Sequence, residues 1–350
     1  RWVCESYIRA RPRRHFNRTC GSNKMSDIKI ISGVANTNCP LCGLESDDVL
    51  AHELRRGEGE VHYCIDCDYG FLATNSIIDT KAYYESEYRK EYSHTAKAAA
   101  TSPTEMFNIY SGFQENRLPF IKPVLTPGSK VLEVGAGAGQ FLTHIKSAVE
   151  TVHAIELDKQ CCTFLKDEIG IEADTEFLEN SRFANEKYDV VCAFQVMEHV
   201  EDPVAFLKSL KKVTRPNGEV FIEVPNLRDA LLSVWDVQSH RKFFYHSAHL
   251  HYFTEKTLSK IAQKAGFDIA DVEINYTQDY NLLNHLHWIM NDGPQENCLV
   301  GMSEVSLAGK DNKMAEWLST EMQALNKRYV EQLVLSKRTS NMIMRLKNES

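Results

Sequence analysis

The segment 131–140 constrains the fold of this chain more than any other. Its apolar run ends in the alternate glycines Gly135, Gly137 and Gly139, and a helix-like pattern begins at Phe141. This order predicts a buried strand, a tight turn and a helix. Glycines let the backbone take positive φ angles and approach a ligand closely, and a helix N-terminus offers unpaired N–H groups. We therefore expect a nucleotide-like ligand at this turn.

A second apolar run, 152–156, ends in the acid Glu156. An acid about twenty residues after the glycines can hold the hydroxyls of a ribose. Together with the run at 130–134, further apolar runs alternate with amphipathic segments, at 171–174, 188–194 and 219–224. This alternation predicts an α/β fold with a parallel sheet covered on both faces, and Asp202 is a candidate cap for the helix that starts at Pro203.

Ligands of such sheets bind beyond the carboxyl ends of the strands. The glycine turn, Glu156, the loop 174–177 and Gln195 are therefore expected on one rim.

Charge divides the chain into two unequal parts. Residues 1–24 hold seven Lys and Arg against one acid, whereas the whole chain has a net charge of −8. We expect residues 1–24 to be a leader or tag, with an Arg-rich transit peptide as the alternative. The acidic remainder argues against a nucleic-acid partner. Because no apolar run is long enough for a membrane helix, no membrane partner and a cytoplasmic location are expected.

Four of the ten cysteines form two Cys-x-x-Cys pairs, namely Cys39 with Cys42 and Cys64 with Cys67. Two such pairs can place four thiolates tetrahedrally around Zn²⁺, and a filled four-thiolate shell makes a structural site. The sequence thus predicts a zinc-binding module over 25–75. Disulfides are the alternative.

Several motifs stand in the order of a known family. The glycine motif from Glu133 to Gly139 and the acid Glu156 precede three further segments, at 188–191, 195–200 and 215–219. Together they resemble the class I S-adenosylmethionine-dependent methyltransferases over residues 106–270. The resemblance implies a Rossmann-like domain at 126–278 with a mostly parallel seven-stranded sheet, and S-adenosylmethionine as the cofactor.

In that family the glycine loop passes the methionine part of the cofactor, the acid after the second strand takes both ribose hydroxyls, and the loop after the third strand meets adenine. Carried over, the resemblance implies these cofactor-binding residues: Glu133, Gly135, Ala136, Gly137, Gly139, Glu156, Leu157, Glu176, Phe177 and Gln195.

The cysteine pairs and the segment 245–254 narrow the resemblance. Together they look like the zinc-containing methyltransferases of bacterial sugar and antibiotic pathways, including the deoxysugar C-methyltransferases. Those C-methyltransferases carry Tyr-His-Glu-His, whose tyrosine and last histidine serve catalysis. The last histidine corresponds to His249, while His246 and Ala248 replace the tyrosine and the glutamate. Methylation at carbon therefore ranks below methylation at oxygen.

A base is needed when the methyl acceptor is a weak nucleophile such as a hydroxyl, and histidine titrates near neutral pH. The candidate catalytic residues are His249 first, then His246, His251 and Tyr245. Histidines near a helix start are also often caps or satisfied polar groups. The pair Glu198 and His199 is expected to support the loop after the fourth strand.

The sequence thus predicts a methyltransferase acting on a small molecule, first a sugar or nucleotide-sugar hydroxyl with a histidine as general base. The alternatives are N- or C-methylation of an amino- or deoxysugar, a zinc-knuckle rRNA methyltransferase, and an inactive fold that carries the zinc module as an interaction platform.

Three further segments are less distinctive. Residues 76–125 are expected to form a helical connection or lid, with one helix over 106–123. The tyrosines at 83–92 either lie on a solvated helix or close over the acceptor. The segment 278–288 either lines the pocket or forms a buried helix. Residues 279–350 are expected to be a helical extension, with a long helix over 311–346 that packs on this subunit or forms a homodimer.

Overall fold

The computed structural model describes residues 31–55, 59–73 and 102–349. The basic segment 1–24 and the tyrosine-rich segment 83–92 lie outside the described residues, as does most of the expected lid.

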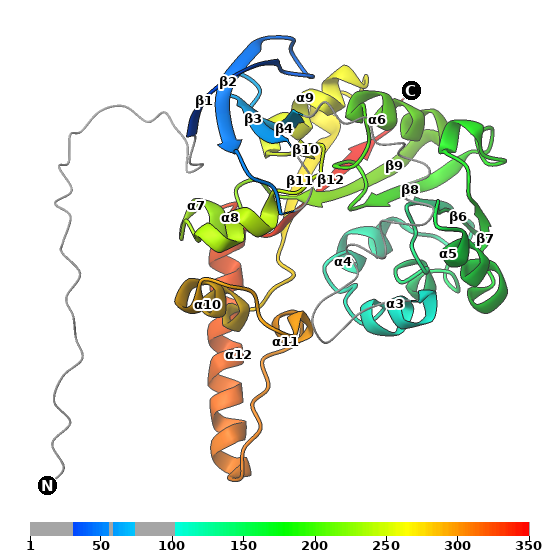
Figure 1. The fold of residues 1–350 in the computed structure, drawn as a ribbon. Coiled ribbons are helices and arrows are strands. Elements are labelled where there is room, and N and C mark those ends of the chain that lie inside the picture. Colours follow the sequence, from blue (N-terminus) through cyan, green and yellow to red (C-terminus); the bar gives the residue numbers. More distant parts are fainter. Residues whose placement is uncertain (1–30, 56–58, 74–101, 350) are drawn as a thin grey trace, which may run out of the picture.

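The larger of two sheets has seven strands in the order β11-β12-β9-β8-β5-β6-β7 (Figure 1). Neighbouring strands from β9 to β7 run parallel, whereas β12 is antiparallel to both β9 and β11. In chain order the strands are β5 Lys130–Val134, β6 Thr151–Ile155, β7 Glu172–Asp174, β8 Tyr188–Phe194, β9 Thr214–Pro225, β11 Val272–Thr277 and β12 Asn341–Lys347. The expected α/β fold with a mostly parallel seven-stranded sheet is confirmed.

Helices pack on both faces of this sheet. The helices of the described chain are α3 Pro103–Tyr110, α4 Leu118–Ile121, α5 Lys159–Phe164, α6 Pro203–Val213, α7 Ala230–Ser233, α8 Gln238–Phe244, α9 Glu255–Lys264, α10 Leu282–Asn291, α11 Cys298–Met302 and α12 Asn312–Leu335, and the last of these extends away from the sheet. The side chain of Asp202 accepts hydrogen bonds from the N–H groups of Val204 and Ala205, so it caps α6 as expected. No helix within the described part of the chain has the length and apolar character needed to cross a membrane.

Two helices expected near the glycine turn are shorter than predicted. After the turn only a 3₁₀ segment forms, Leu142–His144. The helix expected over 106–123 is divided into α3, α4 and a short 3₁₀ segment, Lys122–Val124. Pro119 explains part of the division, because proline lacks an N–H and favours the first turn of a new helix.

The prediction of one helix over 311–346 is wrong at its C-terminal end. Helix α12 stops at Leu335, and the chain then returns to the large sheet as β12. Met342, Ile343 and Met344 are all fully buried because β12 is covered on both faces. A continuous apolar run has no alternation, so its pattern alone does not distinguish a buried strand from a helix.

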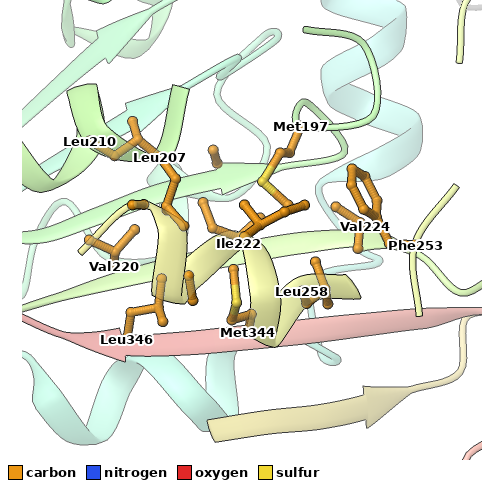
Figure 2. Packing of buried hydrophobic residues seen from close by; sticks show 14 of the residues in the cluster. Met197, Leu207, Leu210, Val220, Ile222, Val224, Phe253, Leu258, Met344 and Leu346 are labelled. Atoms are coloured by element: carbon orange, nitrogen blue, oxygen red, sulfur yellow. The ribbon is translucent and has the colours of Figure 1, made fainter. Parts of the chain in front are cut away.

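The main core lies between the sheet and helices α6 and α9 (Figure 2). Side chains from the loop after β8, from β9, from α9 and from β12 meet there, among them Met197, Ile222, Leu258 and Met344. Cys39, Cys64 and Cys67 belong to the same buried cluster, so the cysteine module packs directly against the large domain.

The smaller sheet is antiparallel and is completed from a distant part of the chain. Its strands are β1 Ile31–Asn38, β2 Glu45–Ala51, β3 Glu60–Cys64 and β4 Tyr69–Ala73, and β10 His251–Tyr252 adds to its edge. Figure 1 shows this sheet at the upper left of the molecule, beside α9.

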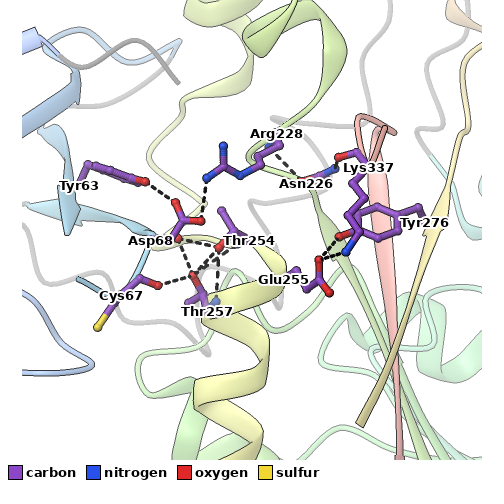
Figure 3. Close-up of polar contacts among 10 residues, drawn as sticks. All are labelled: Tyr63, Cys67, Asp68, Asn226, Arg228, Thr254, Glu255, Thr257, Tyr276 and Lys337. Carbon is purple, nitrogen blue, oxygen red and sulfur yellow. Dashed lines mark hydrogen bonds and ion pairs between the residues drawn. The ribbon is translucent and has the colours of Figure 1, made fainter. Parts of the chain in front are cut away.

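Hydrogen bonds fasten the second cysteine pair to the first turn of α9 (Figure 3). The hydroxyls of Thr254 and Thr257 donate to the carbonyl oxygen of Asp68 at 2.8 and 2.6 Å. The carboxylate of Asp68 in turn pairs with the guanidinium of Arg228 at 2.8 Å. The small sheet is therefore held rigidly against the segment that carries the histidines.

Candidate active site

A cavity of about 230 Å³ lies at the carboxyl ends of β5, β8 and β9. Five of the predicted cofactor-binding residues line it, namely Glu133, Gly135, Ala136, Gly137 and Gln195. The rim expected from the strand order is therefore where the structure places the cavity.

The glycine turn has the geometry that its sequence predicts. Gly135 and Gly137 have φ angles of +76° and +54°. A Cβ atom on Gly135 would come within 2.4 Å of a methyl group of Val196. The turn is held closed by Glu156, whose carboxylate accepts from the N–H of Gly137 at 2.6 Å and from that of Asp158 at 2.8 Å. Glu156 thus lies beside the glycine turn.

The remaining predicted cofactor residues do not line this cavity. A Cβ atom on Gly139 would meet Leu165 at 2.7 Å, so this glycine faces packed side chains. Leu157, Glu176 and Phe177 follow the ends of β6 and β7, and Phe177 is 37% exposed. Their expected contacts with ribose and adenine stay predictions.

Glu133 is the buried carboxyl group nearest in sequence to the turn. It is 3% exposed, and its Oε2 atom has no hydrogen-bond partner in the described structure. Burial raises the pKa of Glu133 to about 8. A buried carboxyl oxygen without a partner, beside glycines that bring no Cβ atom at 135 and 137, fits the ammonium-bearing methionine end of S-adenosylmethionine.

The opposite wall carries Arg117, which sequence reasoning missed. Its guanidinium donates to the carboxylate of Glu223 and to Oε1 of Gln114, and lies 4.6 Å from the ring centre of Phe194. Strand β9 contains two acids, Glu219 and Glu223, so its sequence did not single out Glu223. Arg117 had no sequence signal either, because its partner is remote in sequence.

Asp279 completes this wall. It accepts hydrogen bonds from the side-chain amides of Asn116 at 2.8 Å and Asn341 at 2.6 Å, and burial raises its pKa. The segment 278–288 was expected either to line the pocket or to form a buried helix. Asp279 lines the cavity, and the helix α10 follows it.

A second polar cluster lies farther along the loop after β8. The carboxylate of Glu198 faces the imidazoles of His199 and His249, with Oε1 to Nε2 distances of 3.8 and 4.0 Å. The ring centre of His246 lies 3.8 Å from that of His249. Burial lowers the pKa of His199 to about 4 and that of His249 well below its usual value, so both rings are neutral at pH 7.

The other two predicted catalytic residues are deeply buried. His251 bonds through Nδ1 to the hydroxyl of Tyr69 and through Nε2 to the carbonyl of Val200 at 2.8 Å. Both nitrogens are thus engaged in contacts that join the two sheets. Tyr245 is fully buried against the small sheet. No histidine lines the cavity within the part of the chain that the structure covers.

The four predicted metal ligands are brought together. The sulfur atoms of Cys39, Cys42, Cys64 and Cys67 lie within 4.8 Å of one another, and those of Cys42 and Cys64 are 3.7 Å apart. Sulfurs around a tetrahedral zinc ion are about 3.8 Å apart at a bond length of about 2.3 Å. This separation is too long for a disulfide. The cluster therefore fits a zinc module.

Comparison with known proteins agrees with the geometry of the large domain. Residues 106–272 match a family model described as a methyltransferase domain. The chain is 26% identical over 179 residues to the ubiquinone biosynthesis O-methyltransferase of Actinobacillus pleuropneumoniae, which covers 47% of this chain and 75% of the relative. The protein of the same name from Aromatoleum aromaticum is 23% identical over 175 residues, covering 47% and 74%.

Solved structures give more distant similarities. An S-adenosylmethionine-dependent methyltransferase from Archaeoglobus fulgidus aligns with a TM-score of 0.45 and 18% identity, covering 69% of this chain and 96% of that one. Phosphoethanolamine N-methyltransferase 2 of Haemonchus contortus, in complex with S-adenosylmethionine, aligns with a TM-score of 0.46 and 13% identity, covering 84% and 70%.

The family match spans the glycine turn, the strands that form the cavity and the histidine cluster. Residues 106–272 of this enzyme therefore form a methyltransferase domain with a Rossmann-like fold.

Proposed function

We propose that this enzyme methylates a hydroxyl group of a small polar molecule, with a sugar or a nucleotide-linked sugar as the first candidate. The main observation behind this proposal is that polar side chains line one wall of the cavity and are held in place by hydrogen bonds. Asn116, Arg117 and Asp279 are each held by neighbouring side chains and face the space beside the glycine turn. A wall of this kind recognises hydroxyl groups by hydrogen bonds. Relatives whose names specify O-methylation support oxygen as the acceptor atom.

S-adenosylmethionine supplies a methyl group on a positively charged sulfur. The glycine turn and Glu133 would hold its methionine part. The chain then has to align the acceptor oxygen with that methyl group and remove the hydroxyl proton. A histidine of the cluster around Glu198 would accept the hydroxyl proton. Burial lowers the pKa of His199 and of His249, so both rings are neutral before transfer.

We also propose that Cys39, Cys42, Cys64 and Cys67 bind a structural Zn²⁺ ion. Four thiolates leave no open position for chemistry. The small sheet contributes β4, which pairs with β10 next to the histidines. The ion would therefore stabilise the small sheet, and through β10 the position of the histidines, without taking part in methyl transfer.

A second candidate is transfer to an amine. The cavity contains the carboxyl groups of Glu133, Glu223 and Asp279 but only one guanidinium, that of Arg117. This balance favours a positively charged acceptor such as an amino sugar.

The test is a methyl-transfer assay with labelled cofactor against a panel of free sugars, nucleotide-sugars and amino sugars. We expect His249→Ala to lower the rate by about 10²-fold or more. His52→Ala, an exposed histidine on the small sheet, is the matched control and should keep full activity.

Full activity of His249→Ala would show that this histidine has no role in transfer. Cofactor binding without methylation of any sugar would contradict the acceptor class, and salt-sensitive submicromolar RNA binding would favour the rRNA alternative. Failure to bind S-adenosylmethionine would favour the inactive fold.

A further inference from the structure

We propose that Glu198, His199 and His249 bind a divalent transition-metal ion, and that this ion keeps coordination positions open for an oxygen of the acceptor. The site is distinct from the four-cysteine cluster, and its three residues come from two loops of the large domain.

The spacing of the three side chains suits one ion. Glu198 Oε1 lies 3.8 Å from Nε2 of His199 and 4.0 Å from Nε2 of His249. Two ligands at about 2.1 Å from a common ion are between about 3.0 and 4.2 Å apart, depending on the angle between them. The ring centres of the two histidines are 4.8 Å apart and their planes are nearly perpendicular, at 70°. Only small side-chain movements are needed for all three to reach one ion.

The backbone holds the two loops together before any ion binds. The carbonyl oxygen of Glu198 accepts from the N–H groups of Leu250 and His251 at 2.8 and 3.2 Å. Nδ1 of His199 donates to the carbonyl of Ala248 at 2.7 Å. This bond fixes the tautomer in which Nε2 of His199 carries the lone pair, the arrangement that metal-binding histidines usually show.

Glu198 supplies an independent indication of a missing ligand. Its side chain is 1% exposed, and neither carboxylate oxygen has a hydrogen-bond partner among the residues that the structure describes. Buried carboxyl groups are almost always hydrogen-bonded, paired with a cation or bound to a metal. A cation bound between Glu198 and the two neutral imidazoles would satisfy both oxygens.

The donor set indicates the class of ion and its role. Two imidazoles and one carboxylate suit ions such as Zn²⁺, Mn²⁺, Fe²⁺ or Co²⁺, and three protein ligands leave positions for water or substrate. A hydroxyl bound there loses its proton more easily. This role rests on the proposed function. His249 then serves as a ligand, and His246, whose ring centre is 3.8 Å away, is the histidine left to take the proton.

The test is a titration of the full-length protein with CoCl₂ after its zinc content has been measured, followed by calorimetry and visible absorption. The wild type should bind one equivalent of Co²⁺ without releasing zinc. Glu198→Gln and His249→Ala should each lose this binding at least tenfold, whereas His52→Ala should keep it. Unchanged zinc content and circular dichroism would show that each variant is folded, and one folded variant is enough for the comparison.

Absence of a cobalt equivalent in the wild type would overturn the proposal, as would undiminished binding by a folded variant. Cobalt that only replaces zinc at the cysteines would overturn it too. If Co²⁺ binds as expected but no acceptor in the panel is methylated, the metal site stands and the proposed function fails.

Discussion

Glu133 shows how one residue couples the cofactor site to stability. Its carboxyl group is buried without a partner for Oε2 in the described structure, and its pKa is raised to about 8 from an ordinary value near 4.5. The folded protein therefore binds a proton here that the unfolded chain releases. A raised pKa means that the protonated form is the one that folding favours.

From this we predict that stability falls as pH rises from about 4.5 to about 8, because in this range the folded state holds the proton and the unfolded state does not. Glu133→Gln, which cannot ionise, should remove this part of the pH dependence and be more stable than the wild type at pH 8. Chemical denaturation at several pH values measures both effects. Parallel pH profiles for the two proteins would contradict the prediction.

Among individual residues, the sequence predicted those of the glycine turn better than those of the polar wall of the cavity. The alternate glycines and Glu156 were recognisable because their spacing is local. Arg117 and Glu223 were not, since a buried pair formed across distant parts of the chain leaves no pattern in either segment. His251 belongs to the histidine-rich motif, but its Nδ1 contacts Tyr69 on β4 and its Nε2 contacts Val200 in the loop after β8. Neither partner could be recognised from the motif.

Among the elements, the small sheet bears most directly on the active site. Strand β4 pairs with β10, and Thr254 and Thr257 anchor α9 to the second cysteine pair. The histidine segment, residues 246–251, leads directly into the first of these attachments. Its geometry should therefore depend on the cysteine cluster, although none of the four cysteines of that cluster lines the cavity.

We predict that Cys39→Ser lowers the melting temperature and the rate of methyl transfer together, because three thiolates hold zinc less tightly and the small sheet loosens. Zinc analysis, thermal unfolding and the transfer assay provide the measurements. Cys298→Ser, a half-exposed cysteine on α11, should change none of the three by much. A variant at position 39 that lost zinc but kept full stability and activity would show that the module is dispensable.

The parallel strands were predictable because each is a short apolar run followed by a turn and an amphipathic segment. Strand β12 was not, because it is apolar on both faces and follows a long helix, so a continued helix fitted the pattern equally well. The tertiary structure decides between the two, since β9 and β11 leave a gap that only a strand can fill.

At the scale of the whole molecule, β12 joins the end of the described chain to its core. It pairs with β9 over 341–347 and with β11 over 341–346, and Met344 is fully buried in the main core. Helix α12 extends away from the domain (Figure 1), with Met314 and Trp317 more than half exposed. The homodimer expected through this helix stays a prediction, which sedimentation would test.

Met344 in the core and Met314 on α12 provide a matched comparison of how much each side chain stabilises the fold. Met344→Ala should lower the free energy of unfolding by about 2–5 kcal/mol, since it leaves a cavity in the core. Met314→Ala, on the exposed face of α12, should change it by less than about 0.5 kcal/mol. Denaturant unfolding followed by circular dichroism measures both. Similar values for the two would mean that β12 is not packed as described.

The position of β12 also has a consequence for how the protein is made. During synthesis, β9 and β11 leave the ribosome well before β12 does. Until residues 341–347 emerge, β9 has one unpaired edge and β11 has no partner strand. Exposed strand edges invite pairing with other chains. The parallel strands around the glycine turn can therefore form before β12 completes the sheet. We expect the nascent enzyme to need chaperones mainly during this stage of synthesis.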